Sequence, residues 1–395
     1  MALATTNQSE VIFEITNDNL ETGMRGYPVG YCPTSSVDPQ KGLFYGPMPL
    51  VKVATREPEE LIYSLMYGEE ASAKQLDNFK KELKKRAKCK KETIEAIQRL
   101  PRELHPMKLL SCAQLILGGF EKDGGYREDC LRLIAKIPEL VATVINHHAG
   151  WNSLKESRPE LPYMENFTQM LNVPNTDPKK LTDIFKLFNV LHFDHGGGNL
   201  SAFVGKAVAS GLEDMFGSLS AATSALAGPR HGKANQDCLE FVKSLVKELG
   251  DNYTEGQVEQ AVRDKLANKE LIYGFGHAVL RVEDPRATLQ YDMAEKNYSD
   301  DPCVKMALHL RRAGAKVLGE NKKVQNPFPN VDAISGTLLQ AAGFDYPEYF
   351  TVLFGLSRMV GISIQIVYER EEARKGKGLA IVRPKYFFRS REGKR

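Results

Sequence analysis

The sequence lacks the features that mark a secreted, metal-stapled or membrane-spanning protein. Its 395 residues include six cysteines, with no CxxC pair among them, so neither a disulfide framework nor a structural zinc site is expected. No apolar run reaches the roughly 20 residues that a membrane span requires. The N-terminus has neither the basic start and apolar run of a secretory signal nor the arginines of a mitochondrial presequence. We therefore expect a soluble protein of a reducing compartment, located in the cytoplasm.

A strong charge of either sign is also missing. The formal net charge is +3, with 26% charged residues, whereas a nucleic-acid-binding protein usually carries a strongly basic stripe. Nucleic acid and membrane are therefore not expected as partners. The one basic run, residues 80–91, has no aromatic residues between its charges. It predicts a solvated helix face more readily than a polyanion-binding patch.

Helical patterning covers most of the chain. Apolar residues recur on one face in residues 59–67 and 235–249, and residues 346–368 form a long, mostly apolar helical stretch. Aspartate followed by proline, at 177–178 and again at 301–302, predicts capped helix starts. Strand patterns are confined to the two ends of the chain: residues 11–16, 42–50 and 379–388. The sequence thus predicts an all-α protein, with minor β structure near its termini.

Histidines, arginines and one aspartate stand out as candidates for chemistry. Three histidines lie beside glycines at expected helix ends, where the backbone opens towards a cleft: His195, His231 and His277. Four arginines lie in apolar or turn-like sequence, where a guanidinium needs an anionic partner: Arg281, Arg286, Arg358 and Arg383. Asp332 opens an expected helix, and taken alone it is best interpreted as an N-cap.

Two kinds of site fit these residues. His192 and His195 could contribute to a metal site, but a spacing of three residues followed by glycines is a poor pattern for one. The alternative is acid–base chemistry on a small polyanionic carboxylate, with arginines binding the charge and histidine or aspartate moving protons.

Four segments, in this order and spacing, resemble the citrate synthase family: LAGPRHGKANQ (226–236), GFGHAVLRVEDPR (274–286), NPFPNVDAISG (326–336) and VLFGLSR (352–358). The resemblance extends to LHPM (104–107), NFTQML (166–171), DHGGGNLSA (194–202) and VRPK (382–385). It covers most of the chain from about residue 100 onwards, and the preceding residues match more loosely.

The resemblance implies a fold and an activity. The fold would be all-α, with a large helical domain (1–232 and 344–395) and a small helical domain (233–343) closing over a cleft, in a homodimer. The activity would be the condensation of acetyl-CoA with oxaloacetate, followed by hydrolysis of citryl-CoA to citrate and CoA. Coenzyme A would enter as part of the substrate, without a metal or redox cofactor.

The resemblance also implies roles for individual residues. Asp332 would remove a proton from the acetyl methyl group, His231 would donate a hydrogen bond to the thioester carbonyl, and His277 would polarise the ketone of oxaloacetate. The acid would be bound by His195, Arg286, Phe354, Arg358 and, from the second subunit, Arg383. Coenzyme A would lie near Leu271, Gly274, Ala278 and Arg281.

Some positions depart from the family pattern. Gly196 stands where relatives usually carry an acidic or amide residue, and Arg230 stands where many carry leucine. Phe203 and Ile334 replace residues that are often polar or histidine. None of these is a catalytic group, but they could alter the choice of acyl-CoA, so 2-methylcitrate synthase remains an alternative. A non-catalytic binding protein of the same family is a further alternative, and control by NADH is not expected.

Overall fold

The computed structural model describes residues 11–151, 155–229, 231–250 and 252–390. Its first half contains η1 (Asn17–Glu21), β1 (Ser35–Asp38), β2 (Gly42–Tyr45), β3 (Met48–Pro49), α1 (Leu50–Val53), α2 (Pro58–Tyr67), α3 (Ala73–Arg86), α4 (Lys91–Gln98), α5 (Pro106–Glu121), α6 (Tyr126–Ala149), α7 (Tyr163–Met170) and α8 (Pro178–His192). Its second half contains α9 (Leu200–Ser210), α10 (Met215–Leu226), α11 (Ala234–Leu249), α12 (Glu255–Ala267), α13 (Pro285–Tyr298), α14 (Pro302–Gly319), α15 (Asp332–Ala341), η2 (Pro347–Tyr349), α16 (Phe350–Val367), η3 (Tyr368–Glu372) and α17 (Ala373–Gly376). The all-α prediction is confirmed.

Helix α16 is the centre of the core. It packs against α6, α8, α9 and α10, and nearly all of its residues are buried. The helical run Pro347–Gly376 is long and apolar enough to span a membrane, contrary to the expectation that no apolar run reaches that length. Its apolar window is 94% buried inside the protein, so this run is accounted for as a core helix.

Several predicted helix starts are found where the sequence places them. Asp177 caps α8 by accepting a hydrogen bond from the Lys179 amide, at 3.0 Å. Asp301 caps α14 in the same way, and Thr254 caps α12 within a capping box. These side chains satisfy amide groups that the first helical turn leaves without partners. Asp332 is not an N-cap, because Val331 occupies that position and Asp332 is the first residue of α15.

The β structure differs from the prediction. The only sheet among the described residues is a three-stranded antiparallel one in the order β1-β2-β3, with Ser35 opposite Tyr45 and Phe44 opposite Pro49. The predicted strand at 42–50 therefore exists as β2 and β3. The strands predicted at 11–16 and 379–388 are wrong, because neither segment is a strand and neither pairs with one of the strands that the structure describes.

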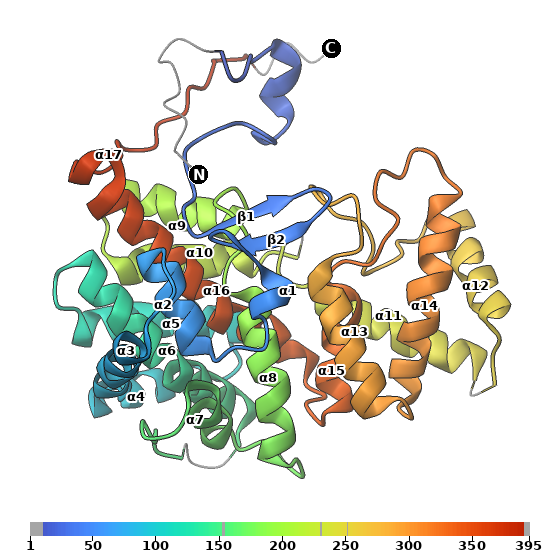
Figure 1. The fold of residues 1–395 in the computed structure, drawn as a ribbon, viewed down its shortest axis with the longest axis horizontal. Coiled ribbons are helices and arrows are strands. Elements are labelled where there is room, and N and C mark those ends of the chain that lie inside the picture. The colour runs from blue at the N-terminus through green and yellow to red at the C-terminus, as the bar shows by residue number, and fades with distance from the viewer. Residues whose placement is uncertain (1–10, 152–154, 230, 251, 391–395) are drawn as a thin grey trace.

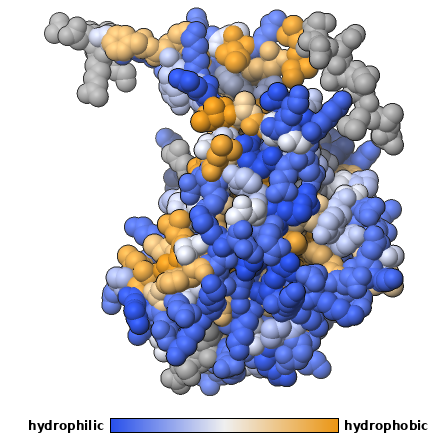
Figure 2. Space-filling view, turned by 90° about the vertical axis from the view of Figure 1, so that its left-hand side faces the viewer, coloured by the Kyte–Doolittle hydropathy of each residue, from blue (hydrophilic) through white to orange (hydrophobic). Residues whose placement is uncertain are grey.

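Helices α11 to α15 gather on one side of the molecule and the other long helices on the opposite side (Figure 1). This arrangement suits a small domain of about the predicted extent, and its boundaries stay a prediction. The N-terminal and C-terminal segments project together from the body (Figure 1) and are joined by an ion pair between Arg389 and Glu21 at 2.8 Å. Figure 2 shows apolar side chains on this projection.

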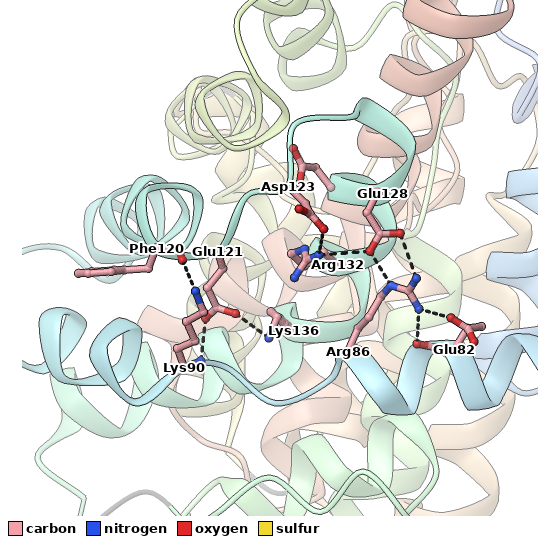
Figure 3. A network of polar contacts seen from close by, with 10 residues as sticks. Glu82, Arg86, Lys90, Phe120, Glu121, Asp123, Glu128, Arg132 and Lys136 are labelled. Carbon is pink, nitrogen blue, oxygen red and sulfur yellow. Dashed lines mark hydrogen bonds and ion pairs between the residues drawn. The ribbon is translucent and has the colours of Figure 1, made fainter.

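The basic run at 80–91 folds into α3 and the start of α4, and intramolecular acceptors take up much of its charge (Figure 3). Arg86 pairs with Glu128 at 2.9 Å and also with Glu82. The Lys90 ammonium donates to the Phe120 carbonyl oxygen at 2.7 Å. Beneath the run, the buried side chains of Lys136 and Glu121 form an ion pair at 2.8 Å. The run therefore contributes to packing between α3, α5 and α6, which argues against a polyanion patch.

Candidate active site

Two buried arginines define the centre of the site. Arg358 lies on α16 and Arg286 in the first turn of α13, each with 3% or less of its surface exposed. The Arg358 guanidinium lies 4.7 Å from the centre of the Phe354 ring and donates from Nε to the His192 carbonyl oxygen at 3.2 Å. Burial lowers the pKa of Arg358 to about 10, so it remains a cation at neutral pH.

Arg286 has a buried carboxylate beside it. Asp284 caps α13 and receives hydrogen bonds from Arg286 Nε at 3.0 Å and Nη2 at 2.7 Å. Burial opposes ionisation of the Asp284 carboxyl, but the effect of the adjacent Arg286 guanidinium is larger. The pKa of Asp284 is therefore lowered. Pro285 follows at the first helical position, so the segment repeats the Asp-Pro helix start of α8. Sequence reasoning missed Asp284, although the Asp-Pro pattern could have identified it as a cap.

His195 and His277 face each other across the site. Their rings are 5.3 Å apart between centroids. The buried Nε2 of His195 has no hydrogen-bond partner among the described residues, so it is free to contact a ligand. Burial lowers the pKa of both histidines, and the positive charge of Arg286 lowers it further in each. Both rings are therefore neutral at physiological pH.

The tautomer of His277 follows from its contacts. Its Nδ1 accepts hydrogen bonds from the amides of Val279, at 3.0 Å, and Leu280, at 2.9 Å. A nitrogen that accepts two amide hydrogens carries none itself, so the ring proton is on Nε2. His277 consequently presents a neutral N–H donor.

His231 is arranged in a similar way. Its Nε2 accepts a hydrogen bond from the Ser201 amide, in the first turn of α9, at 3.2 Å. Its proton is therefore on Nδ1, which is a donor. Burial lowers the pKa of His231 to about 4, with the charge of Arg358 as a smaller cause.

Asp332 begins α15 at the edge of the same region. Burial raises its pKa to about 6, and the nearby positive charge of Arg286 limits the rise. The carboxyl is therefore a stronger base than an exposed aspartate, yet ionised at neutral pH. Because Arg286 acts on Asp332, His195 and His277, and Arg358 acts on His195 and His231, these groups share one electrostatic environment.

The loop before α13 carries the residues expected at coenzyme A. Gly274 has a φ of +81° and lies so close to Ala333 that a β-carbon would be 2.7 Å from its Cα atom. Leu271 is exposed, and Ala278 lies next to His277 in the chain. The Arg281 guanidinium donates to the carbonyl oxygens of Val279 and Leu280, at 3.0 and 2.8 Å. The Arg281 side chain therefore stabilises the loop in which it lies.

Arg383 lies apart from these groups. It is exposed on the C-terminal segment, and its neighbour Val382 donates its amide hydrogen to Ser210 Oγ at 2.9 Å. Within one chain it does not join the site. Arg230, one of the positions that depart from the family pattern, lies outside the described residues. Within the described ranges, no group of three or more His, Cys, Asp or Glu side chains could hold a metal ion.

A second buried carboxylate is Asp194, which sequence reasoning considered only beside His192 and His195 in the metal-site alternative. It precedes His195 and is fully buried. Its Oδ2 accepts a hydrogen bond from Ser35 Oγ at 2.8 Å and another from Thr34 Oγ1. Its Oδ1 accepts from Gln365 Nε2 at 2.7 Å. Thr34 and Ser35 lie some 160 residues earlier in the chain, so no local pattern could have indicated the contact.

Comparison with known proteins identifies relatives of this chain. Residues 23–385 match the family model described as citrate synthase, C-terminal domain. The chain is 36% identical to the mitochondrial citrate synthase of Citrus maxima and 35% identical to mitochondrial citrate synthase 4 of Arabidopsis thaliana. Each alignment covers 94% of this chain and 82% of the relative. Because these relatives are named mitochondrial, the predicted cytoplasmic location is contradicted.

Solved structures agree with this assignment. Citrate synthase from Thermotoga maritima superposes with a TM-score of 0.78 at 25% identity, covering 93% of this chain and 95% of that one. The Thermoplasma acidophilum enzyme, in a ternary complex with carboxymethyl coenzyme A and oxaloacetate, superposes with a TM-score of 0.77 at 25% identity. That match covers 93% of this chain and 97% of the other.

Proposed function

The chain belongs to the citrate synthase family and is an enzyme of acyltransferase type; from this premise we propose that it condenses acetyl-CoA with oxaloacetate and releases citrate and CoA. The observation that carries the proposal is the state of three groups. His231 and His277 are neutral N–H donors, and Asp332 is an ionised base of raised pKa. The names of the curated relatives favour a mitochondrial location for this reaction.

Oxaloacetate is a dicarboxylate, and the buried cations provide its binding site. Arg286 and Arg358 each use only some of their guanidinium N–H groups in hydrogen bonds to the protein. Among the described contacts, Arg358 donates only from Nε. The remaining N–H groups suit bidentate binding of a carboxylate. His195 Nε2 adds a neutral contact, and Phe354 supports the Arg358 guanidinium.

Enolate formation needs a base and a donor in the same dry site. Asp332 takes a proton from the acetyl methyl carbon, and the electron pair moves onto the thioester oxygen. His231 Nδ1–H donates to that oxygen, so the developing charge is stabilised without a full proton transfer. A methyl group next to a thioester is a very weak acid, and a preorganised donor typically contributes a factor of about 10² to 10³ in rate.

The carbon–carbon bond then forms. The enolate carbon attacks the ketone carbon of oxaloacetate, and the carbonyl oxygen of the ketone becomes an alkoxide. The Nε2–H of His277 polarises that carbonyl and supplies the proton to the alkoxide. Citryl-CoA results, and water cleaves its thioester to give citrate and the free thiol of CoA. The proton that Asp332 took from the methyl group replaces the one that His277 gave to the alkoxide, so both groups are restored. Every step uses only groups of this chain and water.

Coenzyme A would lie along the loop of Leu271, Gly274 and Ala278. Four apolar side chains are exposed on this loop and on the segment that it contacts through the Gly276 amide and the Phe328 carbonyl oxygen: Leu271, Tyr273, Val279 and Phe328. They offer a surface for the apolar parts of a cofactor-sized ligand. Arg281 is partly exposed and could approach a phosphate only by giving up its hydrogen bonds to the Val279 and Leu280 carbonyl oxygens and to Gln325.

A homodimer would complete the acid site. Large apolar side chains are exposed on one group of helices and on the C-terminal segment: Leu115 and Phe120 on α5, Leu200 on α9, Leu212 after α9, and Ile381, Phe387 and Phe388 near the C-terminus. Such a surface is typical of a subunit interface. Because Arg383 lies outside the site of its own chain, we propose that it reaches the site of the partner.

The activity is tested by following release of the CoA thiol from acetyl-CoA with and without oxaloacetate. We expect release that depends on oxaloacetate and a higher kcat/KM for acetyl-CoA than for propionyl-CoA. A clear preference for propionyl-CoA would make the chain a 2-methylcitrate synthase, since one methylene is worth only about 1–3 kcal/mol in a pocket. No release with either thioester would favour the non-catalytic alternative.

A further inference from the structure

The hairpin of β1 and β2 contacts both halves of the acid-binding site, although none of its residues takes part in the chemistry above. Its base lies at Thr34, Ser35 and Tyr45, and its tip at Pro39 to Gly42. In Figure 1 the hairpin lies between the large group of helices and the group that contains α13.

The base of the hairpin holds the loop that carries His195. Ser35 Oγ donates to Asp194 at 2.8 Å and accepts the Gly196 amide hydrogen at 2.7 Å, so one hydroxyl bonds the residues on both sides of His195. Asp194 Oδ1 also accepts the His195 amide hydrogen, at 3.0 Å. Gly196 has a φ of +70°, a left-handed conformation that glycine adopts without strain.

The same base supports the arginine region through Tyr45. Its hydroxyl donates to the Val190 carbonyl oxygen at 2.7 Å, and the Asp194 amide approaches it at 3.4 Å. Tyr45 is buried beside both arginines, whose charges act on it. The hairpin therefore forms one wall of the site as well as a support for its loop.

The tip of the hairpin contacts the loop that carries His277 and Arg286. The Arg281 amide donates to the Pro39 carbonyl oxygen at 2.8 Å. Gly42 has a φ of +92°, and a β-carbon there would lie 2.4 Å from Pro285 Cγ. Pro285 directly precedes Arg286, so any side chain at position 42 would push against the segment that aims this guanidinium.

We propose that the β1–β2 hairpin is a positioning element for oxaloacetate. Its base sets the place of His195 and its tip sets the place of Arg286, so that the two bind one dicarboxylate from opposite sides. Ser35 and Gly42 are its positioning residues, and Ser35 acts through Asp194 and Gly196 on the loop that carries His195. This inference rests on the proposed function, because it assumes that oxaloacetate is the ligand of these groups.

The base is tested with Ser35→Ala, and Ser36→Ala is the matched control, since Ser36 is the exposed neighbour on the same strand. We expect Ser35→Ala to weaken oxaloacetate binding about tenfold, as loss of a hydrogen bond to a charged group does. The KM for acetyl-CoA should stay within about twofold, because a general loss of structure would affect both substrates. Ser36→Ala should behave as the unaltered protein.

The tip is tested with Gly42→Ala against Gly46→Ala. Both glycines have a positive φ, but a β-carbon at Gly46 meets nothing within 4 Å. Both variants therefore carry backbone strain in the left-handed region, and only Gly42→Ala collides with Pro285. We expect Gly42→Ala to weaken oxaloacetate binding at least tenfold, and Gly46→Ala to lower thermal stability without changing that binding.

Oxaloacetate binding is measured by calorimetry on the full chain, which needs no turnover. If the unaltered protein binds oxaloacetate but Ser35→Ala and Gly42→Ala bind it equally well, the hairpin inference is overturned while the proposed function stands. If the unaltered protein does not bind oxaloacetate, the proposed function fails first. Should Ser35→Ala not fold, the two glycine variants still decide the question.

Discussion

At the scale of single residues, the site depends on which protonation state burial favours. His231 and His277 are held neutral, and each uses one ring nitrogen as an acceptor so that the other becomes a donor. The pKa of Asp332 is raised, whereas those of the histidines are lowered, because burial favours the protonated form of a carboxyl. The same desolvation therefore yields two neutral donors and one strengthened base.

The pH dependence of activity should reflect Asp332. Its carboxylate must be ionised to act as a base, so kcat/KM should fall as pH decreases through about 6. The histidines should add no transition near their ordinary pKa, because burial lowers the pKa of His195, His231 and His277, that of His231 to about 4. A pH–rate profile from pH 5 to 8 measures this. Asp332→Glu shifts the position of the carboxyl. If the fall in kcat/KM at low pH were unchanged in this variant, another group would be responsible for it.

Asp332→Asn should lower activity and raise stability. Removing the base should reduce kcat by a factor of about 10² or more. A carboxyl whose pKa is raised by folding destabilises the folded state as pH rises from about 4 to 6. The neutral amide should therefore stabilise the protein at pH 7 by about 1–3 kcal/mol. Urea unfolding is the measurement, with the exposed Asp292→Asn as control; an equal gain in both variants would contradict this account.

Sequence reasoning identified residues better than it identified their contacts. His195, His231, His277 and Arg358 were singled out because glycines or apolar neighbours surround them. Asp332, taken alone, suggested an N-cap, since its burial among charges is set by distant segments. Asp284 was missed, and Asp194 was considered only for a metal site, because an aspartate before proline or histidine does not reveal which side chains will surround it.

At the scale of elements, local signals predicted helix starts and failed for isolated strands. Asp177 and Asp301 act within one turn, so their effect can be read from neighbouring residues. A strand needs a partner for its backbone groups, and alternation alone does not provide one. Residues 11–16 and 379–388 have suitable composition but no partner strand in the part of the chain that the structure describes. The short strand β1 was missed because Ser35 to Asp38 is polar, and its pairing with β2 determines it.

The buried pair of Lys136 and Glu121 ties α6 to α5 below the basic run (Figure 3). Lys136→Met leaves the Glu121 carboxylate buried without its cation, and we expect a loss of about 3–5 kcal/mol. Adding Glu121→Gln should recover part of this loss, because the amide oxygen can still accept from Lys90 and Thr93.

Urea midpoints of the single and double variants at fixed protein concentration test this pair. Lys81→Met is the control, since its ion pair with Asp77 is exposed and should be worth less than about 1 kcal/mol. If the double variant were less stable than Lys136→Met, the buried carboxylate would not be the cause of the loss.

At the scale of the whole molecule, we expect a second subunit to complete the acid-binding site. Arg383 is exposed on a projecting segment and absent from its own site, so the acid site would be complete only in a dimer. Subunits carrying Arg383→Ala and Asp332→Asn should each form poorly active homodimers. A hybrid dimer has one site with both groups, because the Asp332→Asn subunit still supplies Arg383 to its partner.

Co-refolding equal amounts of the two variants tests this requirement. If subunits pair at random in a two-fold symmetric dimer, half of the dimers are hybrids with one intact site of two, so about a quarter of the unaltered activity should return. Activity no higher than that of the separate variants would show that Arg383 does not act across the interface.

The central claim, that this chain joins the acetyl methyl carbon to oxaloacetate, is tested most directly by following that carbon. The full chain is incubated with oxaloacetate and acetyl-CoA labelled with ¹³C at the methyl group, and the products are examined by NMR. The account predicts that the label appears in a methylene group of citrate, with one free CoA thiol per citrate. Label found in acetate would mean that the thioester is merely hydrolysed, and label remaining in acetyl-CoA would mean that the chain does not catalyse the reaction.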